Sequence, residues 1–116
     1  AMTGAAGGLA GGLWAHAGAQ LLPGAPCVLD AIGFDGLMRA ARFVVTGEGR
    51  LDDQTLAGKA VGEVATRCRQ AGVACHAVVG SEHLDAFRER LIDLSSVTEA
   101  GTVRALRAAG RRLAAV

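Results

Sequence analysis

The segment Val45–Lys59, VTGEGRLDDQTLAGK, decides how this chain is expected to fold. A short β-branched run, Phe43–Val45, leads into it and predicts a buried strand. A glycine-spaced polar loop follows, and the segment closes with Gly58-Lys59 at the start of a helical pattern. Polar groups gathered where a strand meets a helix are typical of the functional edge of an α/β domain. The segment therefore predicts both a strand–loop–helix unit and a site.

The rest of the chain alternates between helical and extended patterns. Strands that alternate with helices predict a parallel sheet with right-handed crossovers. We therefore expect a three-layer α/β fold, Rossmann- or flavodoxin-like, with a short parallel sheet and flanking helices. At 116 residues the chain is one such domain or a piece of one. Helices are expected over residues 4–18, 27–41 as two short helices, 55–71, 82–90 and 99–115, and two further strands over 73–79 and 91–97.

Chemistry is concentrated in the first of three loops that follow the predicted strands, at residues 46–55, 80–82 and 97–99. In a parallel sheet such loops share the edge where ligands bind. Gly47 and Gly49 allow the backbone to approach a ligand closely. Amide groups there and at the start of the next helix suit an anion such as phosphate. The sequence therefore predicts an anion-binding loop.

Side chains of the same loop suit phosphoryl transfer. Arg50 and Lys59 can balance the charge of a phosphate or a carboxylate. Carboxylates can hold Mg²⁺ together with waters, or accept a hydroxyl proton, and an amide such as Gln54 can bind a ligand hydroxyl. Positioning and charge neutralisation provide most of the catalysis in phosphoryl transfer. The carboxylates of the loop are Glu48, Asp52 and Asp53.

A purely structural interpretation of these residues stays open. Asp52, Asp53 and Thr55 are good N-cap residues for a helix. Glu48 and Arg50 can form a solvent-exposed ion pair worth well under ~1 kcal/mol. In that case the loop would hold the fold together and bind nothing.

Two well-known nucleotide motifs do not match. A P-loop would need Gly at position 53 and Ser or Thr at position 60, where the chain has Asp53 and Ala60. A dinucleotide fingerprint fails because Gly47 and Gly49 are followed by Asp52 where a third glycine is needed. Any phosphate site in this chain therefore belongs to another class.

Composition excludes several kinds of protein. The net charge is +1 and the basic residues are spread along the chain, which argues against a nucleic-acid binder. No apolar run approaches the ~20 residues of a membrane span, and no secretory signal is visible. Three cysteines without paired spacing, Cys27, Cys68 and Cys75, predict reduced thiols and a cytoplasmic location. Cys68 and Cys75 are expected in the core, and no metal site is expected from His and Cys.

Three segments carry a family resemblance. The run TGEGRLD at residues 46–52 is followed by Gln54-Thr55 and Gly58-Lys59. Upstream lie GAAGGL at residues 4–9 and VLDAIGFD at residues 28–35. In order and spacing these segments resemble the glycerate kinase family, whose members phosphorylate D-glycerate with ATP. The central run is far more specific than a lone glycine pattern.

The resemblance implies a reaction and a set of roles. The ATP γ-phosphoryl group would pass to a hydroxyl of D-glycerate, giving phosphoglycerate and ADP, with Mg²⁺ as cofactor. Asp52 would hold Mg²⁺ or take the hydroxyl proton. The implied catalytic residues are Glu48, Arg50, Asp52 and Lys59. The implied substrate- and nucleotide-binding residues are Gly4, Gly7, Gly8, Gly47, Gly49, Gln54 and Thr55.

The resemblance covers residues 3–80 well and the rest loosely, and it reaches only the C-terminal portion of the family's proteins. Those have two α/β domains with the substrate between them, and they usually carry Ser where this chain has Asp53. We therefore expect a fragment of such a kinase, a separately encoded piece that needs a partner, or a truncated relative. In each case the chain is expected to be incomplete alone, with a missing N-terminal domain or a homodimer completing it. The alternative is a non-catalytic, ligand-binding or self-associating module.

Overall fold

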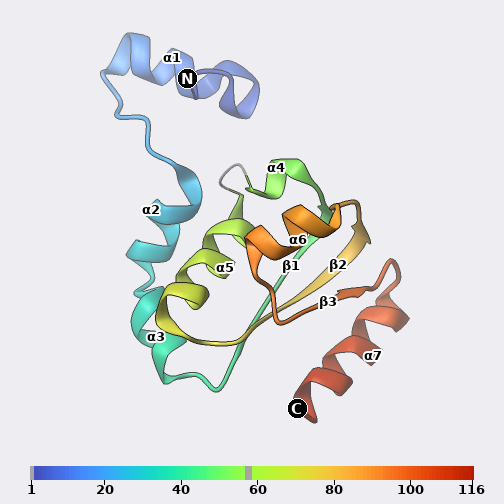
Figure 1. Ribbon diagram of the computed structural model, residues 1–116. Helices are drawn as coiled ribbons and strands as arrows, with labels where there is room; N and C mark the ends of the chain where they lie inside the picture. The colour runs from blue at the N-terminus through green and yellow to red at the C-terminus, as the bar shows by residue number, and fades with distance from the viewer. Residues whose placement is uncertain (1, 57–58) are drawn as a thin grey trace.

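The computed structural model describes residues 2–56 and 59–116 and shows an α/β fold with a parallel sheet (Figure 1). The sheet has the order β1-β2-β3, and both neighbouring pairs are parallel. The strands are β1 Val44–Leu51, β2 Cys75–Glu82 and β3 Ser96–Glu99. The helices are η1 Ala5–Gly8, α1 Leu9–Ala17, α2 Gly24–Ala31, α3 Phe34–Ala40, α4 Asp53–Leu56, α5 Ala60–Ala71, α6 Ala86–Ile92 and α7 Val103–Ala114. The predicted fold class is confirmed.

The core lies between the sheet and α5. Along β2, Cys75, Ala77 and Val79 are buried and alternate with residues of the other face, as a strand requires. The face of α5 that is turned to the core buries Val61, Val64, Ala65 and Cys68. Small side chains on both sides let the helix approach the sheet closely.

Helix α7 forms the third layer. Val78, which points away from the core, shares an apolar groove of about 580 Å³ with Leu106 and Leu113 of α7. The helix therefore covers the sheet face opposite α5 and α6 (Figure 1). Its start is fixed by Thr102, whose hydroxyl accepts a hydrogen bond from the Ala105 amide at 3.2 Å.

The first strand is longer than predicted. The run expected to be a loop continues the strand, with Glu48 opposite Val79 and Leu51 opposite Glu82. Glycine suits position 47 because the two strands approach closely there. A Cβ added at Gly47 would collide with the Val78 carbonyl oxygen. The prediction that the strand ends at Val45 is therefore wrong.

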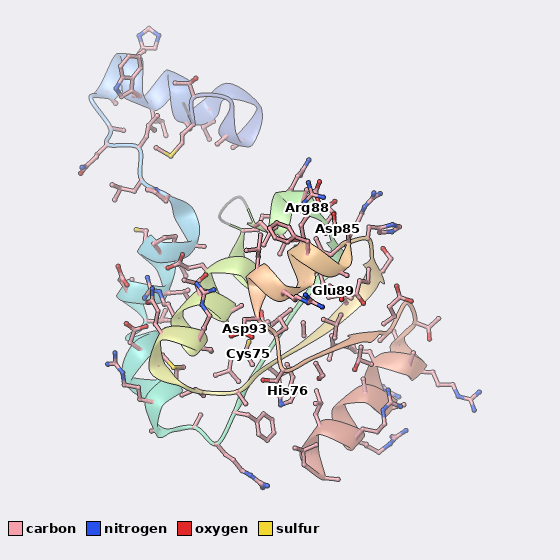
Figure 2. All side chains as sticks on the ribbon, viewed as in Figure 1. Cys75, His76, Asp85, Arg88, Glu89 and Asp93 are labelled. Atoms are coloured by element: carbon pink, nitrogen blue, oxygen red, sulfur yellow. The ribbon has the colours of Figure 1, made fainter. Side chains whose placement is uncertain are left out.

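Element boundaries on either side also shift. The helix expected over 55–71 consists of α4 and α5, and residues 57 and 58 lie outside the described residues. The strand expected over 91–97 is wrong in its first half, because α6 runs to Ile92 and β3 begins at Ser96. Asp85 begins α6 by accepting the Arg88 amide at 2.8 Å, and both side chains are labelled in Figure 2.

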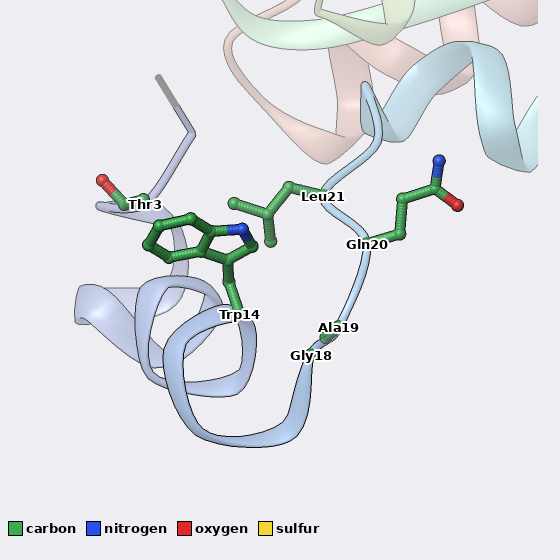
Figure 3. A pocket seen from close by; sticks show the side chains of 6 residues that line it. All are labelled: Thr3, Trp14, Gly18, Ala19, Gln20 and Leu21. Carbon is green, nitrogen blue, oxygen red and sulfur yellow. The ribbon is translucent and has the colours of Figure 1, made fainter.

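The N-terminal arm, residues 2–22, extends away from the sheet, and the molecule is 51 Å long (Figure 1). The sequence predicts a closely packed helix here, and this is wrong, since α1 buries no residue. Trp14 is 57% exposed and lines a local cavity of about 550 Å³ with Thr3 and Leu21 (Figure 3). The arm thus presents apolar surface that nothing in the described chain covers.

Candidate active site

The site is a cavity of about 580 Å³ where α2, β1 and the start of α5 meet. It contains Glu48 and Lys59, two residues predicted as catalytic that are eleven positions apart in the chain. An acid and a base thus face one space. The remaining lining residues are Gly24, Ala25, Val28, Leu29 and Ala60.

Glu48 is held in place by α4. Its side chain is partly buried on β1, and Oε1 accepts a hydrogen bond from the Thr55 hydroxyl. Thr55 is fully buried and accepts the amide of Asp52 at 3.2 Å. The second oxygen of Glu48, Oε2, has no hydrogen-bond partner among residues 2–56 and 59–116. Glu48 therefore keeps one oxygen for a ligand.

Lys59 stands at the N-terminus of α5. It is the N-cap residue, its carbonyl oxygen accepts the Glu63 amide at 3.1 Å, and its side chain is exposed. It makes no ion pair within the described part of the chain. The amides at the start of a helix and a nearby ammonium group both attract anions.

Arg50 and Asp52 follow Glu48 closely in the chain but are not among the residues that line the cavity. Arg50 Nε is 3.2 Å from Asp52 Oδ2, and the Arg50 side chain is 64% exposed. The ion pair expected between Glu48 and Arg50 is therefore wrong, because Glu48 bonds to Thr55 instead. Asp52 Oδ1 also accepts the Gln54 amide at 3.0 Å, so Asp52 caps α4 as the structural interpretation predicts.

An arginine fixes the wall made by α2. Arg67 of α5 lies 2.6 Å from Asp30 of α2, 3.2 Å from Asp35 of α3 and 2.8 Å from Glu63. Hydrogen bonds to Glu63 and Asp30 raise the pKa of the Arg67 guanidinium. Since Arg67 joins three helices, it sets the position of α2 over the cavity.

The thiols of Cys68 and Cys75 and the ring of His76 have structural roles. Burial raises the pKa of the Cys75 thiol to about 12, and burial also raises the pKa of Cys68. His76 Nδ1 lies 2.8 Å from Ser96 Oγ, and its ring meets Phe43 edge-on at 5.5 Å (Cys75 and His76 are labelled in Figure 2). The core cysteines predicted from sequence are confirmed.

Comparison with known proteins identifies the family of this chain. The sequence model of the glycerate kinase family matches residues 1–111. The chain belongs to the glycerate kinase family. It is 50% identical over 78 residues to a glycerate kinase of Halalkalibacterium halodurans, covering 67% of this chain and 20% of that protein. A glycerate kinase of Neisseria meningitidis is 49% identical over 78 residues, with 67% and 21% covered.

A solved structure agrees with the fold. The crystal structure of a putative glycerate kinase 2 from Salmonella typhimurium LT2 matches with a TM-score of 0.58 and 33% identity. The match covers 85% of this chain and 25% of that one. The chain thus spans about a fifth to a quarter of the length of these glycerate kinases.

The residues present can be tested against Mg²⁺, which the glycerate kinase family implies. The described residues contain no cluster of three or more His, Cys, Asp or Glu side chains that could hold a metal ion. Mg²⁺ bound with a nucleotide commonly uses one or two carboxylates plus phosphate oxygens and waters. Glu48 meets that requirement through Oε2, whereas both oxygens of Asp52 are engaged. Glu48 fits better than Asp52.

The remaining predicted residues of the glycerate kinase motif lie in different places. Gly47 and Gly49 are in β1, and Gln54 is exposed on α4. Gly4, Gly7 and Gly8 lie in the N-terminal arm, and Figure 1 shows this arm apart from β1. The structure therefore does not bring the arm glycines together with Glu48, and their ligand-binding role stays a prediction.

Sequence reasoning missed the contribution of α2. Gly24, Ala25 and Val28 line the cavity, but Pro23 to Pro26 reads as a loop. A signal was present, because proline is well tolerated in the first turn of a helix and Pro26 lies in the first turn of α2. No pattern in the local sequence predicts that α2 lies beside β1.

Proposed function

We propose that this chain forms one wall of a glycerate kinase active site. The reaction is transfer of the ATP γ-phosphoryl group to a hydroxyl of D-glycerate, giving phosphoglycerate and ADP. The observation that carries the proposal is the cavity shared by Glu48 and Lys59 at the N-terminus of α5. It places a carboxylate, an ammonium group and helix amides together, as phosphoryl transfer requires.

The side chains divide the work. Lys59 and the first amides of α5 neutralise phosphate charge, and Arg50, oriented by Asp52, adds a second cation at the rim. Glu48 either accepts the proton of the attacking hydroxyl or contributes one oxygen to Mg²⁺. When bound, Mg²⁺ supplies charge neutralisation on the phosphates. Gly47, Gly49 and Gln54 keep their predicted ligand-facing roles as part of this proposal.

The chain needs further protein to complete the site. It spans 20% and 21% of the two glycerate kinases named above, and Leu9 and Trp14 are 61% and 57% exposed. Exposed apolar surface of this kind favours association. We propose that the rest of a glycerate kinase, acting in the cytoplasm, covers the arm and supplies the other wall. A homodimeric, non-catalytic module is the second candidate, and the same exposed residues favour it.

No helix among the described residues is long and apolar enough to cross a membrane. Glycerate-dependent ADP formation is the direct test of the proposed function. The chain is assayed alone and after replacing the matching segment of a full-length glycerate kinase. Glu48→Gln and Lys59→Ala should each lower kcat by about 10²-fold or more. Arg104→Gln on α7 is the control and should leave kcat unchanged.

Wild-type activity retained in both Glu48→Gln and Lys59→Ala would contradict the proposal. A stable dimer of the isolated chain, together with an inactive replacement protein, would favour the non-catalytic module. Melting temperature with Mg-ATP, ADP or D-glycerate provides a second test, since a ligand that binds only the folded state raises it.

A further inference from the structure

Thr55 has an unusual position for a polar residue next to a ligand site. It is the one fully buried polar side chain in the part of the chain that the structure describes. It lies in α4, directly against α5, because Gly62 has no side chain, and a Cβ there would collide with the Thr55 carbonyl oxygen. Burial on both sides leaves its side chain little freedom.

The Thr55 hydroxyl both donates and accepts a hydrogen bond inside the chain. Its single proton goes to Glu48 Oε1, and its oxygen accepts the Asp52 amide at 3.2 Å. A buried hydroxyl costs free energy unless it is hydrogen-bonded, and these two bonds remove that cost. With the proton committed to Glu48, Thr55 has no donor left for a ligand.

The hydrogen bond from Thr55 affects the orientation of the Glu48 carboxylate. A glutamate side chain has three torsions, and the last is broad, so a carboxylate at a cavity wall is poorly oriented by itself. The Thr55 hydroxyl fixes one oxygen and so restricts the orientation of the carboxylate beside the space that Glu48 shares with Lys59. We propose that Thr55 is a positioning residue that orients the Glu48 carboxylate for phosphoryl transfer, an inference that rests on the proposed function.

Two substitutions separate positioning from packing. Thr55→Val keeps the volume and removes the hydroxyl, whereas Thr55→Ser keeps the hydroxyl and removes a methyl group. Positioning predicts that Thr55→Val lowers kcat by about 10–100-fold with KM for ATP nearly unchanged, while Thr55→Ser stays near wild type. A packing role predicts the opposite order, with Thr55→Ser the more damaged variant. That order, or wild-type kcat in Thr55→Val, would overturn the proposal.

Coupling to Glu48 is tested in a double-mutant cycle, in the form of the chain that shows glycerate-dependent ADP formation. In a Glu48→Gln background, Thr55→Val should cost little further kcat, because the group it orients is already changed. Independent, additive losses would contradict the inference. If Thr55→Val does not fold, Thr55→Cys, with a similar volume and a weak S–H donor, replaces it with the same expected order.

Crystal structures distinguish failure of this inference from failure of the proposed function. The Glu48 carboxylate should leave its wild-type position in Thr55→Val and keep it in Thr55→Ser. If no form of the chain shows kinase activity but Glu48 moves as expected, positioning stands and the proposed function fails. If Glu48 stays in place in Thr55→Val, the positioning inference fails whatever the activity.

Discussion

The packing of α5 against α4 leads to a prediction about a single methyl group. Replacing glycine by alanine inside a helix ordinarily stabilises a protein, since alanine has the higher helix propensity. Gly62→Ala should do the reverse, because the new Cβ would collide with the Thr55 carbonyl oxygen. Gly110→Ala in α7 is the matched control, since a Cβ there has no atom within 4 Å.

The two effects can be compared in size. Helix propensity favours alanine over glycine by about 0.8–1 kcal/mol, and this gain applies to both positions. Overpacking costs about 1–3 kcal/mol, and the atom in the way at Gly62 is backbone, which cannot rotate aside. Gly62→Ala should therefore lose about 1 kcal/mol while Gly110→Ala gains about 0.8 kcal/mol. The two Tm values should then differ by roughly 8 °C.

Urea and thermal unfolding, followed by circular dichroism, measure both variants against wild type. The urea midpoint should fall for Gly62→Ala and rise for Gly110→Ala, with the m-value unchanged. If Gly62→Ala stabilises the protein as much as Gly110→Ala does, the close approach of α5 to Thr55 is refuted. Helix α5 would then not hold α4 at Thr55.

Three further outcomes are expected. Arg67→Met removes the ion pairs that hold α2 and α3, so their amides should exchange several-fold faster while those of β2 stay unchanged. Alkylation at pH 8 should label exposed Cys27 and leave Cys75, whose pKa is raised to about 12, unlabelled until unfolding, as mass spectrometry would show. Burial and the nearby Glu89 raise the pKa of Glu82, so the folded state holds its proton more tightly. Stability should thus fall as pH rises above about 4.5, and Glu82→Gln should flatten that fall in urea titrations at pH 4 and 7.

The fold could be predicted wherever the pattern is local. Helix α5 shows its apolar face and its Gly72 stop in the sequence, and the structure has both. The end of β1 could not be predicted, because Gly47 and Gly49 look like loop residues in isolation. Their extended conformation depends on pairing with β2, some thirty positions away. Such non-local pairing leaves no periodic signal within the segment itself.

The candidate site, like the fold, could be predicted from the sequence only in part. Glu48 and Lys59 could be proposed from their chemistry, whereas the hydrogen bond from Thr55 to Glu48 could not be predicted. A threonine at the start of a helix suits a ligand and a helix cap equally well. The structure shows the hydroxyl donating to Glu48, and this depends on how β1 and α4 lie relative to each other. The α2 wall was missed because Arg67 holds it from a distant helix.

The exposed arm and the open cavity have a common cause. Helix α1 has nine residues, fewer than the ~12–15 that an isolated helix needs to be stable in water, so its order depends on further contacts. Exposed apolar residues follow the arm along the chain, because Leu22 is 52% exposed and Val28, which lines the cavity beside Glu48, is 58% exposed. We expect a partner that covers the arm to reach Val28 as well, and under the proposed kinase function the same partner would complete the active site.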